Sequence, residues 1–452
     1  MKHGEGHTIY MLGIGGIGMS ALARYYRHEG YTVAGYDRTP SPLTRQLEDE
    51  GMTIHYEDRP DLLPYPIDFV VYTPAVPQDL KEFEALRQTN IKIMKRSEAL
   101  GLVTEQHFSL GIAGTHGKTT TTAMVAHILH TCGKDTTAFI GGIANNFSSN
   151  LLLGHGDDSI MVVEADEYDR SFLQLHPNVS IINSIDADHL DVYKERKFLV
   201  EAFNAFANKT DGPVIVKEGL EVEAKHIIRF GFGENCDYRA IIIKSERGLI
   251  DFEIEHNGQK TQVALPMAGN HNVLNATAAF IAALQVGLEP EAIAKALSTF
   301  KGVKRRFDIH VNNERHCYID DYAHHPEEIR SCLTAAREAY RGKRITLVFQ
   351  PHLFSRTRDF MDGFASALAL ADELILLDIY PAREEATNFP GVTSKALLDK
   401  VSLSDKCLCT KDALIDLIDS KKPELLITMG AGDIDRFVEP LEKKIKTWLR
   451  RF

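Results

Sequence analysis

The feature that most constrains the fold is an apolar run that passes through a glycine turn into a helix. Phe108–Ala113 is followed by the turn Gly114-Thr-His-Gly117 and then by Lys118-Thr119. The apolar residues between positions 124 and 129 recur on one face at helical spacing, and Gly133 is a natural stop. A strand that turns directly into a helix is typical of a parallel α/β architecture.

The same turn has the chemistry of a phosphate-binding loop. Backbone N–H groups and the helix dipole favour an anion at such a helix start. Lys118 adds a cation for the outer phosphates, and the hydroxyl of Thr119 can bind Mg²⁺. The strict motif would place glycine at position 112, where this chain has Ile112, so the match is to the Gly-Lys-Thr core. An ordinary turn with a solvated lysine is the alternative, but the strand–turn–helix context favours a nucleoside triphosphate site.

Composition narrows the class of protein. A chain of 452 residues with 44% hydrophobic and 25% charged residues is typical of a globular protein of about three domains. The net charge of −12 argues against a nucleic-acid partner or an anionic membrane surface. There is no apolar leader and no apolar run of 18 residues, so we expect no membrane association and a cytoplasmic location. The six scattered cysteines form no zinc pattern and are expected to be reduced thiols.

Strand–glycine–helix units recur along the chain and predict parallel sheets in three domains. The predicted boundaries are 1–105, 106–304 and 305–452, with a break near residue 105 and a linker at 302–308. Further strands are expected at 32–37, 69–74, 159–164, 180–185, 344–350 and 373–378, strand-like pieces at 238–265, and a helix at about 272–287.

The first unit carries a second glycine motif. Gly13, Gly15 and Gly18 satisfy G-x-G-x-x-G after a strand, and Asp37 lies at the end of the next strand. The motif indicates only that a diphosphate can approach the backbone. NAD, FAD and the diphosphate of a UDP-sugar all fit it, and so does a tight turn without a ligand.

Two acidic clusters follow strands of the central region. Glu164-Ala-Asp-Glu167 comes after an apolar strand, and Asp186-Ala-Asp188-His189-Leu-Asp191 follows the next one. Because the carboxyl ends of parallel strands meet at one edge of a sheet, both clusters are expected beside the phosphate loop. Such groups can bind a metal ion or position phosphate; the alternative is a set of solvated acids at strand ends.

Two polar clusters occur in the third region. Asp320-Asp321-Tyr-Ala-His-His325-Pro ends a strand and starts a helix, and Gln350-Pro-His352-Leu-Phe-Ser-Arg356-Thr-Arg358 follows another strand. Arg356 and Arg358 could together bind a carboxylate. A helix start with solvated histidines and a solvated basic turn are the plainer interpretations.

Nine motifs in this order resemble the Mur ligase family over essentially the whole chain, and the first of them is similar to its alanine-adding branch. They are Gly13–Ser20, Gly114–Thr121, Glu164–Glu167, Asp186–Asp191, Gly269–Thr277, Arg305–Asp308, Asp321–Pro326, Phe349–His352 and Gly430–Asp433. Each motif is weak alone, whereas nine in sequence order are highly specific.

The resemblance implies a Rossmann-like N-terminal domain for a UDP-sugar, a central P-loop ATPase domain and a Rossmann-like C-terminal domain for an amino acid. It implies an ATP-dependent enzyme that joins L-alanine to the lactyl carboxylate of UDP-N-acetylmuramate through an acyl phosphate, in peptidoglycan precursor synthesis. ATP and Mg²⁺ are the implied cofactors, and a monomer or weak homodimer is expected.

The resemblance also implies roles for individual residues. Lys118, Glu164, His189, Arg306 and Asp321 would be catalytic. ATP would be bound by Gly114, Thr115, His116, Gly117, Lys118, Thr119, Thr120, Asn272, Arg306 and Asp321, with Thr119, Glu164 and His189 as metal ligands. The UDP-sugar would contact Gly13, Gly15, Gly16, Ile17, Gly18 and Asp37, and the amino acid would lie near His325, His352 and Arg356.

Two departures from the family pattern matter. Family members often carry a basic residue where this chain has Leu353, so the side chains that bind the amino-acid carboxylate stay open. The region 201–207 contains no lysine before Lys209, so we expect no carbamylated lysine.

Four other functions fit part of this pattern. A sister ligase that adds a preformed peptide would share these motifs, whereas a folylpolyglutamate-type ligase lacks the first glycine-rich domain. An NAD-dependent dehydrogenase would leave both the Gly117-Lys118-Thr119 loop and the carboxylate clusters unexplained. A non-catalytic nucleotide-binding switch is the fourth alternative; ADP release that depends strictly on both the UDP-sugar and the amino acid would exclude it and the dehydrogenase.

Overall fold

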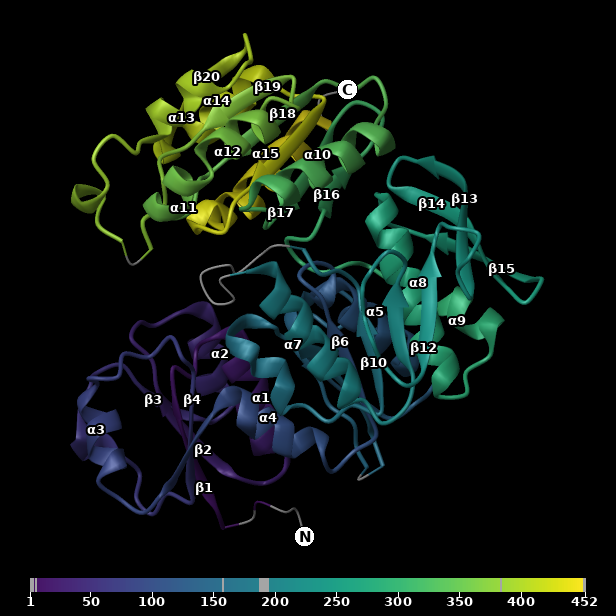
Figure 1. Ribbon diagram of the computed structural model, residues 1–452. Coiled ribbons are helices and arrows are strands. Elements are labelled where there is room, and N and C mark those ends of the chain that lie inside the picture. Colours follow the sequence, from purple (N-terminus) through teal and green to yellow (C-terminus); the bar gives the residue numbers. More distant parts are fainter. Residues whose placement is uncertain (1–3, 5, 157, 187–194, 383, 450–452) are drawn as a thin grey trace. The chain divides into compact units, whose positions relative to one another are not determined.

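The computed structural model describes residues 4, 6–156, 158–186, 195–382 and 384–449. It contains three β-sheets with associated helices (Figure 1). The chain forms two compact units, the first of Met1–Ile241, Glu253–Val263 and Leu274–Lys301, the second of Ile242–Phe252, Ala264–Val273 and Gly302–Phe452.

The first sheet has five parallel strands in the order β3-β2-β1-β4-β5. The strands are β1 Thr8–Leu12, β2 Thr32–Tyr36, β3 Thr53–His55, β4 Phe69–Tyr72 and β5 Lys92–Lys95. The helices are α1 Ile17–His28, α2 Pro42–Asp49, α3 Lys81–Arg87 and α4 Arg96–Thr104, with a 3₁₀ turn η1 at Pro60–Leu62. The central strand β1 is almost wholly buried, as is typical of a parallel sheet covered on both faces.

The second sheet has ten strands in the order β15-β14-β13-β12-β11-β10-β6-β9-β7-β8. They are β6 Ser109–Ala113, β7 Thr136–Ala144, β8 Ser149–Leu152, β9 Ile160–Ala165, β10 Val179–Ile182, β11 Val214–Lys217, β12 Ile227–Gly231, β13 Tyr238–Glu246, β14 Leu249–His256 and β15 Gln259–Leu265. The helices are α5 Lys118–Thr131, α7 Arg196–Asn208, α8 Asn270–Gln285 and α9 Pro290–Leu297, with a 3₁₀ helix η2 at Tyr168–Gln174. β6 lies between β10 and β9 and is parallel to both, so the ends of these three strands form one edge.

The third sheet has six strands in the order β16-β17-β21-β18-β19-β20, and only β16 runs antiparallel to its neighbour. The strands are β16 Asp308–Asn312, β17 Cys317–Asp321, β18 Ile345–Phe349, β19 Glu373–Leu376, β20 Lys406–Leu408 and β21 Leu425–Met429. The helices are α10 Pro326–Ala339, α11 Phe354–Asp359, α12 Met361–Leu368, α13 Ser394–Lys400, α14 Lys411–Lys421 and α15 Val438–Leu449, with 3₁₀ turns η3 Ala386–Asn388 and η4 Asp433–Phe437.

Side chains of this third sheet alternate between two cores. Ile319 and Leu347 pack in the core that also contains residues of α10, α12 and α13. Their neighbours Tyr318 and Val348 pack in the core that contains residues of α14 and α15. Helices therefore cover both faces, as in a doubly wound fold.

The predicted α/β class with parallel sheets is confirmed, and the strands form close to the predicted positions. Helix α8 begins at Asn270, two residues before the predicted start. Helix α5 is buried on most of its surface rather than on one face, because it packs against β7, β9 and α9. The predicted domain boundaries at residues 105 and 304 fall between helices and strands. They stay a prediction, because the two compact units of the structure do not correspond to the three predicted domains.

None of the helices in the described part of the chain combines the length and the apolar character needed to cross a membrane. All six cysteines lie within the described residues and are free.

Candidate functional site

The phosphate loop joins β6 to α5 and requires glycine at two positions. Gly114 has φ +138° and Gly117 has φ +82°, backbone conformations that residues with a Cβ rarely adopt. A Cβ added at Gly117 would lie 2.6 Å from Oδ1 of Asn275, and one at Gly114 would lie 3.0 Å from the backbone N of Ser184. Gly117 is also the N-cap residue of α5, so the N–H groups of the first helical turn face this loop.

The residues after β10 hold the loop in place. The N–H of Thr115 donates to the Ser184 carbonyl (3.2 Å), and the N–H of His116 donates to Ser184 Oγ (2.8 Å). The N–H of Asp186 donates to Thr115 Oγ1 (3.1 Å), and the His116 ring lies 3.7 Å from the Asp186 carboxylate. Strand β10 therefore ends at Ile182, short of the predicted residue 185, because the following residues bind the loop.

Lys118 lies over the loop and contacts a buried carboxylate. Its Nζ donates to the Gly114 carbonyl (2.6 Å) and to both oxygens of Glu167 (2.8 and 3.0 Å). Burial alone would lower the pKa of Lys118, but the carboxylates of Glu167, Asp166 and Glu164 hold that pKa above its ordinary value. Burial raises the pKa of Glu167, and Lys118 opposes that shift. Lys118 is consequently a cation at neutral pH.

Glu164, at the end of β9, lies between α5 and β7. The Thr119 hydroxyl donates to its Oε1 (3.0 Å), and the N–H of Gly141 donates to its Oε2 (2.8 Å). Mg²⁺ prefers oxygen ligands and is usually bound by one or two carboxylates together with phosphate and water oxygens. The paired hydroxyl and carboxylate fit that preference beside the phosphate loop.

The predicted third ligand, His189, lies outside the described residues, as do Asp188 and Asp191. Among the residues that are described, no group of three or more His, Cys, Asp or Glu side chains could hold a metal ion. Of the three metal ligands implied by the family resemblance, Thr119 and Glu164 therefore lie within the described residues.

Sequence reasoning missed two buried asparagines at this loop. Asn275 faces Gly117, and Nδ2 of Asn183 donates to Thr121 Oγ1 (2.9 Å) in the first turn of α5. Asn275 is the second asparagine of the His-Asn-x-x-Asn motif, so this motif could have indicated it from the sequence. Thr120 is buried in the same turn. Asn272 belongs to the second compact unit, where its Nδ2 donates to the Ala268 carbonyl (2.7 Å).

The N-terminal glycine loop is closed partly by its own hydrogen bonds. Gly13 has φ +80°, and its carbonyl accepts from the N–H of Gly16 (3.3 Å), the N-cap residue of α1. Asp37 follows β2 as predicted, but its Oδ2 accepts from the N–H of Gly15 (2.8 Å). Ile17 is exposed at the start of α1. Asp37 therefore helps to fix the shape of this loop.

Arg96, which the sequence analysis did not single out, lies against this loop. A Cβ added at Gly18 would lie 2.9 Å from Nη1 of Arg96. The Arg96 guanidinium is also 3.9 Å from the carboxylate of Asp166. The first turn of α1 thus has a cation beside it, as an anionic ligand would require.

Asp321, at the end of β17, joins the segment before β16 to the segment after β17 through hydrogen bonds. Its Oδ2 accepts a hydrogen bond from the N–H of Phe307, and its Oδ1 accepts one from the N–H of Ala323; each donor–acceptor distance is 2.7 Å. Burial raises the pKa of Asp321 to about 6, and the charge of Arg306 opposes this shift. The Arg306 guanidinium lies 5.4 Å from the centre of the Tyr322 ring. Arg306 and Asp321, paired in the sequence-based hypothesis, therefore lie in one neighbourhood.

A group of aromatic and basic side chains surrounds His352. Its ring stacks on Tyr380 at 5.7 Å and lies 6.2 Å from the ring of His324, while its Nδ1 is 3.3 Å from Nη1 of Arg356. Leu353 has φ +70° and donates its N–H to the Tyr380 carbonyl (3.0 Å). His352 and Arg356 are thus brought together as expected, with Tyr380 and His324 as additional members.

Two residues of the same motifs face elsewhere. The ring of His325 packs edge-on against Phe360 at 4.5 Å, and the ring of the neighbouring His324 lies 6.2 Å from that of His352. Arg358 pairs with Asp359 (2.7 Å) at the surface. Of the two arginines considered from the sequence as a clamp, Arg356 lies beside His352, whereas Arg358 is paired with Asp359.

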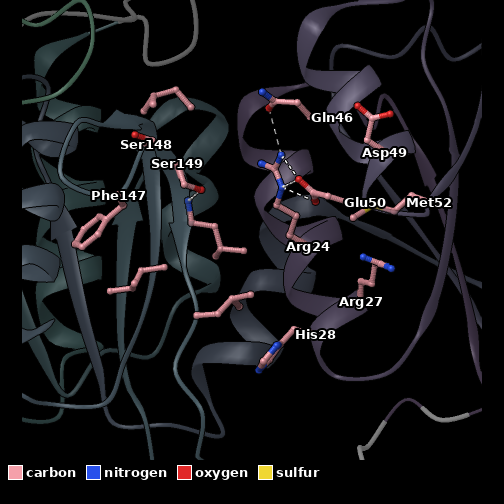
Figure 2. Close-up of a pocket in the computed structure, with 14 residues that line it drawn as sticks. Arg24, Arg27, His28, Gln46, Asp49, Glu50, Met52, Phe147, Ser148 and Ser149 are labelled. Atoms are coloured by element: carbon pink, nitrogen blue, oxygen red, sulfur yellow. Dashed lines mark hydrogen bonds and ion pairs between the residues drawn. The ribbon is translucent and has the colours of Figure 1, made fainter.

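A cavity of about 980 Å³ lies apart from the phosphate loop, within the first unit. Figure 2 shows the Arg24 guanidinium directed at Glu50 and Gln46 on one side, with Phe147, Ser148 and Ser149 opposite. Arg24 also donates to Oδ1 of Asn150 in β8 (3.1 Å). No residue predicted to bind a ligand lines this cavity.

Comparison with known proteins identifies the family. Models of the Mur ligase family catalytic domain, the Mur ligase middle domain and the Mur ligase glutamate ligase domain match residues 8–108, 112–283 and 305–432. The chain belongs to the Mur ligase family. This Mur ligase is 45% identical over 450 residues to the UDP-N-acetylmuramate–L-alanine ligase of Cytophaga hutchinsonii, with 96% of each chain covered. It is 46% identical over 445 residues to the enzyme of that name from Christiangramia forsetii, covering 96% and 97%.

Solved structures give the same family. The crystal structure of UDP-N-acetylmuramate-alanine ligase from Thermotoga maritima superimposes with a TM-score of 0.83 and 30% identity, covering 98% of this chain and 99% of that one. A murein peptide ligase from Psychrobacter arcticus gives a TM-score of 0.73 and 25% identity, covering 97% and 99%.

Proposed function

We propose that this Mur ligase joins L-alanine to the lactyl carboxylate of UDP-N-acetylmuramate at the expense of ATP, in peptidoglycan precursor synthesis. The observation that carries the proposal is the similarity to enzymes of that name, at 45% and 46% identity over 96% of this chain. The phosphate loop with its partly buried lysine supports the ATP-dependent half of the reaction. The N-terminal glycine loop with Arg96 beside it supports binding of a diphosphate.

The chemistry follows from carboxylate activation. The lactyl carboxylate attacks the γ-phosphorus of ATP, which releases ADP and leaves an acyl phosphate. The amine of L-alanine then attacks the acyl carbon, phosphate departs, and the amine loses a proton as the amide forms. Lys118 and the loop N–H groups would stabilise negative charge on the transferring phosphoryl group, mostly through positioning and electrostatics.

Mg²⁺ would be bound by Thr119 and Glu164, with His189 as the further ligand that the family resemblance implies. When bound, it would neutralise phosphate charge. In the amino-acid site, His352 and Arg356 would face the carboxylate of alanine, and Tyr380 would support the His352 ring. We further infer a cytoplasmic monomer or weak homodimer without a nucleic-acid partner.

The test measures phosphate release with UDP-N-acetylmuramate and ATP across a panel of amino acids. L-Alanine should give the highest kcat/KM, ahead of glycine and L-serine. A pocket separates substrates that differ by one methylene by about 1–3 kcal/mol, so the preference should be about tenfold or more. Phosphate release without any amino acid, or equal release with all of them, would contradict the proposal.

A sister ligase that adds a preformed peptide is the second candidate, supported by the similarity to the murein peptide ligase. The tripeptide L-alanyl-γ-D-glutamyl-meso-diaminopimelate belongs in the same panel. If this peptide supported turnover and free L-alanine did not, the second candidate would replace the first.

A further inference from the structure

The ammonium group of Lys118 already has three acceptors within the protein. They are the Gly114 carbonyl at 2.6 Å and the two oxygens of Glu167 at 2.8 and 3.0 Å. An ammonium group has three N–H donors and no more. A phosphate oxygen can therefore be bound by Lys118 only if at least one of these three contacts is given up.

Glu167 is held firmly in this position. Its side chain is 0% exposed, and it follows β9 at the start of η2. The Glu167 carbonyl accepts from the N–H of Arg170 (3.0 Å), and the adjoining Asp166 carbonyl accepts from the N–H of Phe172 (2.9 Å). A buried carboxylate that loses its cation is strongly destabilised, so Glu167 retains Lys118 until another partner for the lysine arrives.

We propose that Glu167 is a built-in competitor for Lys118, occupying with its carboxylate oxygens the position that a nucleotide phosphate oxygen takes when the loop is filled. The inference rests on the proposed function in so far as the loop binds a nucleotide. Glu167 is a positioning residue: it acts on the phosphate through Lys118. Binding of nucleotide then includes an exchange of carboxylate for phosphate on one ammonium group, and Glu167 lowers the affinity for nucleotide.

If the ion pair between Glu167 and Lys118 were purely structural, Glu167 would raise the affinity for nucleotide instead of lowering it. If Glu167 only held the loop in shape, neutralising it would loosen the loop and weaken nucleotide binding. If Glu167 competes, Glu167→Gln leaves a side chain of equal size but a much poorer acceptor for the ammonium, and nucleotide binds more tightly. A gain in affinity is thus a readout that structural damage does not produce.

The experiment measures binding of the non-hydrolysable analogue AMP-PNP, without UDP-sugar or amino acid, by isothermal titration calorimetry at fixed Mg²⁺ and 0.15 M salt. Glu167→Gln should bind about tenfold more tightly than the wild type. Asp166→Asn is the matched control: it removes the same charge one residue away, from a partly exposed carboxylate that lies 3.9 Å from the Arg96 guanidinium and acts on Lys118 through its charge, without a hydrogen bond to it. Because exposed charges are screened at this ionic strength, its affinity should change less than about twofold.

A double-variant cycle tests whether the gain passes through the lysine. In the Lys118→Ala background, Glu167→Gln should no longer tighten binding. If Glu167→Gln does not fold, Glu167→Asp replaces it; this shorter side chain cannot keep both contacts and should also bind AMP-PNP more tightly. Equal or weaker binding by a folded variant, or a gain that persists without Lys118, would overturn the inference. Failure of the wild type to bind AMP-PNP would instead contradict the proposed function.

Discussion

The hydroxyl of Thr119 donates a hydrogen bond to Oε1 of Glu164, at a distance of 3.0 Å. The other oxygen of this carboxylate accepts from the N–H of Gly141, so Glu164 ties the first turn of α5 to β7. A residue proposed from the sequence as a metal ligand is therefore also part of the framework of the loop.

Replacing Glu164 should separate these two roles. Glu164→Gln keeps one acceptor oxygen, so the free energy of unfolding should fall by only about 1 kcal/mol, the net value of one hydrogen bond. The loss of the negative charge should raise the Mg²⁺ concentration needed for half-maximal phosphate release by at least about tenfold. A magnesium titration and a urea denaturation series measure the two effects. An unchanged magnesium requirement would exclude Glu164 as a metal ligand.

Lys118→Ala removes the cation over the loop. Because negative charge develops on the phosphoryl group during transfer, losing a preorganised group of this kind typically lowers the rate by about 10²–10³. ADP release should fall by that factor, whereas binding of UDP-N-acetylmuramate, followed by calorimetry, should hardly change. Turnover near the wild-type rate would show that the phosphate site has been assigned to the wrong loop.

Gly117→Ala and Gly133→Ala form a matched pair at the two ends of α5. Both glycines have positive φ, +82° and +78°, so either alanine should destabilise the fold by about 1–2 kcal/mol. Only at Gly117 would the new Cβ meet a neighbour, Asn275 Oδ1 at 2.6 Å; at Gly133 nothing lies within 4 Å. Displacement of the loop should reduce kcat about 100-fold in Gly117→Ala alone.

Thermal melting and phosphate release on both variants measure these effects. Equal activity losses in the two variants would show that backbone strain, and not the contact with Asn275, explains the glycine at position 117.

Arg96→Ala should weaken binding of the UDP-sugar. A hydrogen bond to a charged group contributes about 1.5–3 kcal/mol, so the Kd for UDP-N-acetylmuramate should rise about tenfold or more. The affinity for AMP-PNP should change much less, since Arg96 lies against Gly18, whereas Lys118 of the phosphate loop is bound by Gly114 and Glu167. Arg45→Ala, at an exposed position on α2, is the control and should leave both affinities unchanged. Loss of AMP-PNP binding instead would assign Arg96 to the nucleotide.

Asp321 should make stability depend on pH in a defined window. Burial raises its pKa to about 6, so between about pH 4 and 6 the native state holds a proton that the unfolded state has released. The free energy of unfolding should therefore decrease as the pH rises through this window. In Asp321→Asn this part of the decrease should be absent, whereas Asp412→Asn, at an exposed position, should behave as the wild type.

Urea denaturation at pH 4, 5, 6 and 7 measures the slope. Parallel curves for the wild type and Asp321→Asn would show that the Asp321 carboxyl titrates normally.

Much of the candidate site was predictable because its residues are close in sequence. Lys118 and Thr119 follow their loop directly, and Glu164 and Asp321 lie at strand ends, where a parallel sheet collects ligand-binding groups at one edge. His352 and Arg356 are four residues apart and meet as expected. The local pattern was sufficient for these positions.

Other relationships could not be found in this way. The cluster that contains Glu167 was expected beside the phosphate loop, but the sequence did not show that Glu167 pairs with Lys118, 49 residues away. Asn275 is far along the chain from Gly117, and Arg96 reaches Gly18 from a different helix. The contacts of His324 with His352 and of His325 with Phe360 also join residues that are far apart in the sequence. A sequence shows that such polar residues exist but not which of them meet.

The amino-acid sequence by itself determined the parallel α/β class, the glycine turns and the strand ends that carry the chemistry. These features depend on local backbone preferences and on the spacing of apolar residues, and both can be recognised within short stretches of the sequence. Only the tertiary structure decided which buried carboxylate pairs with Lys118 and which arginine lies at the N-terminal loop. Those partners are chosen by how the strands are ordered in the sheets, a property of the whole folded chain.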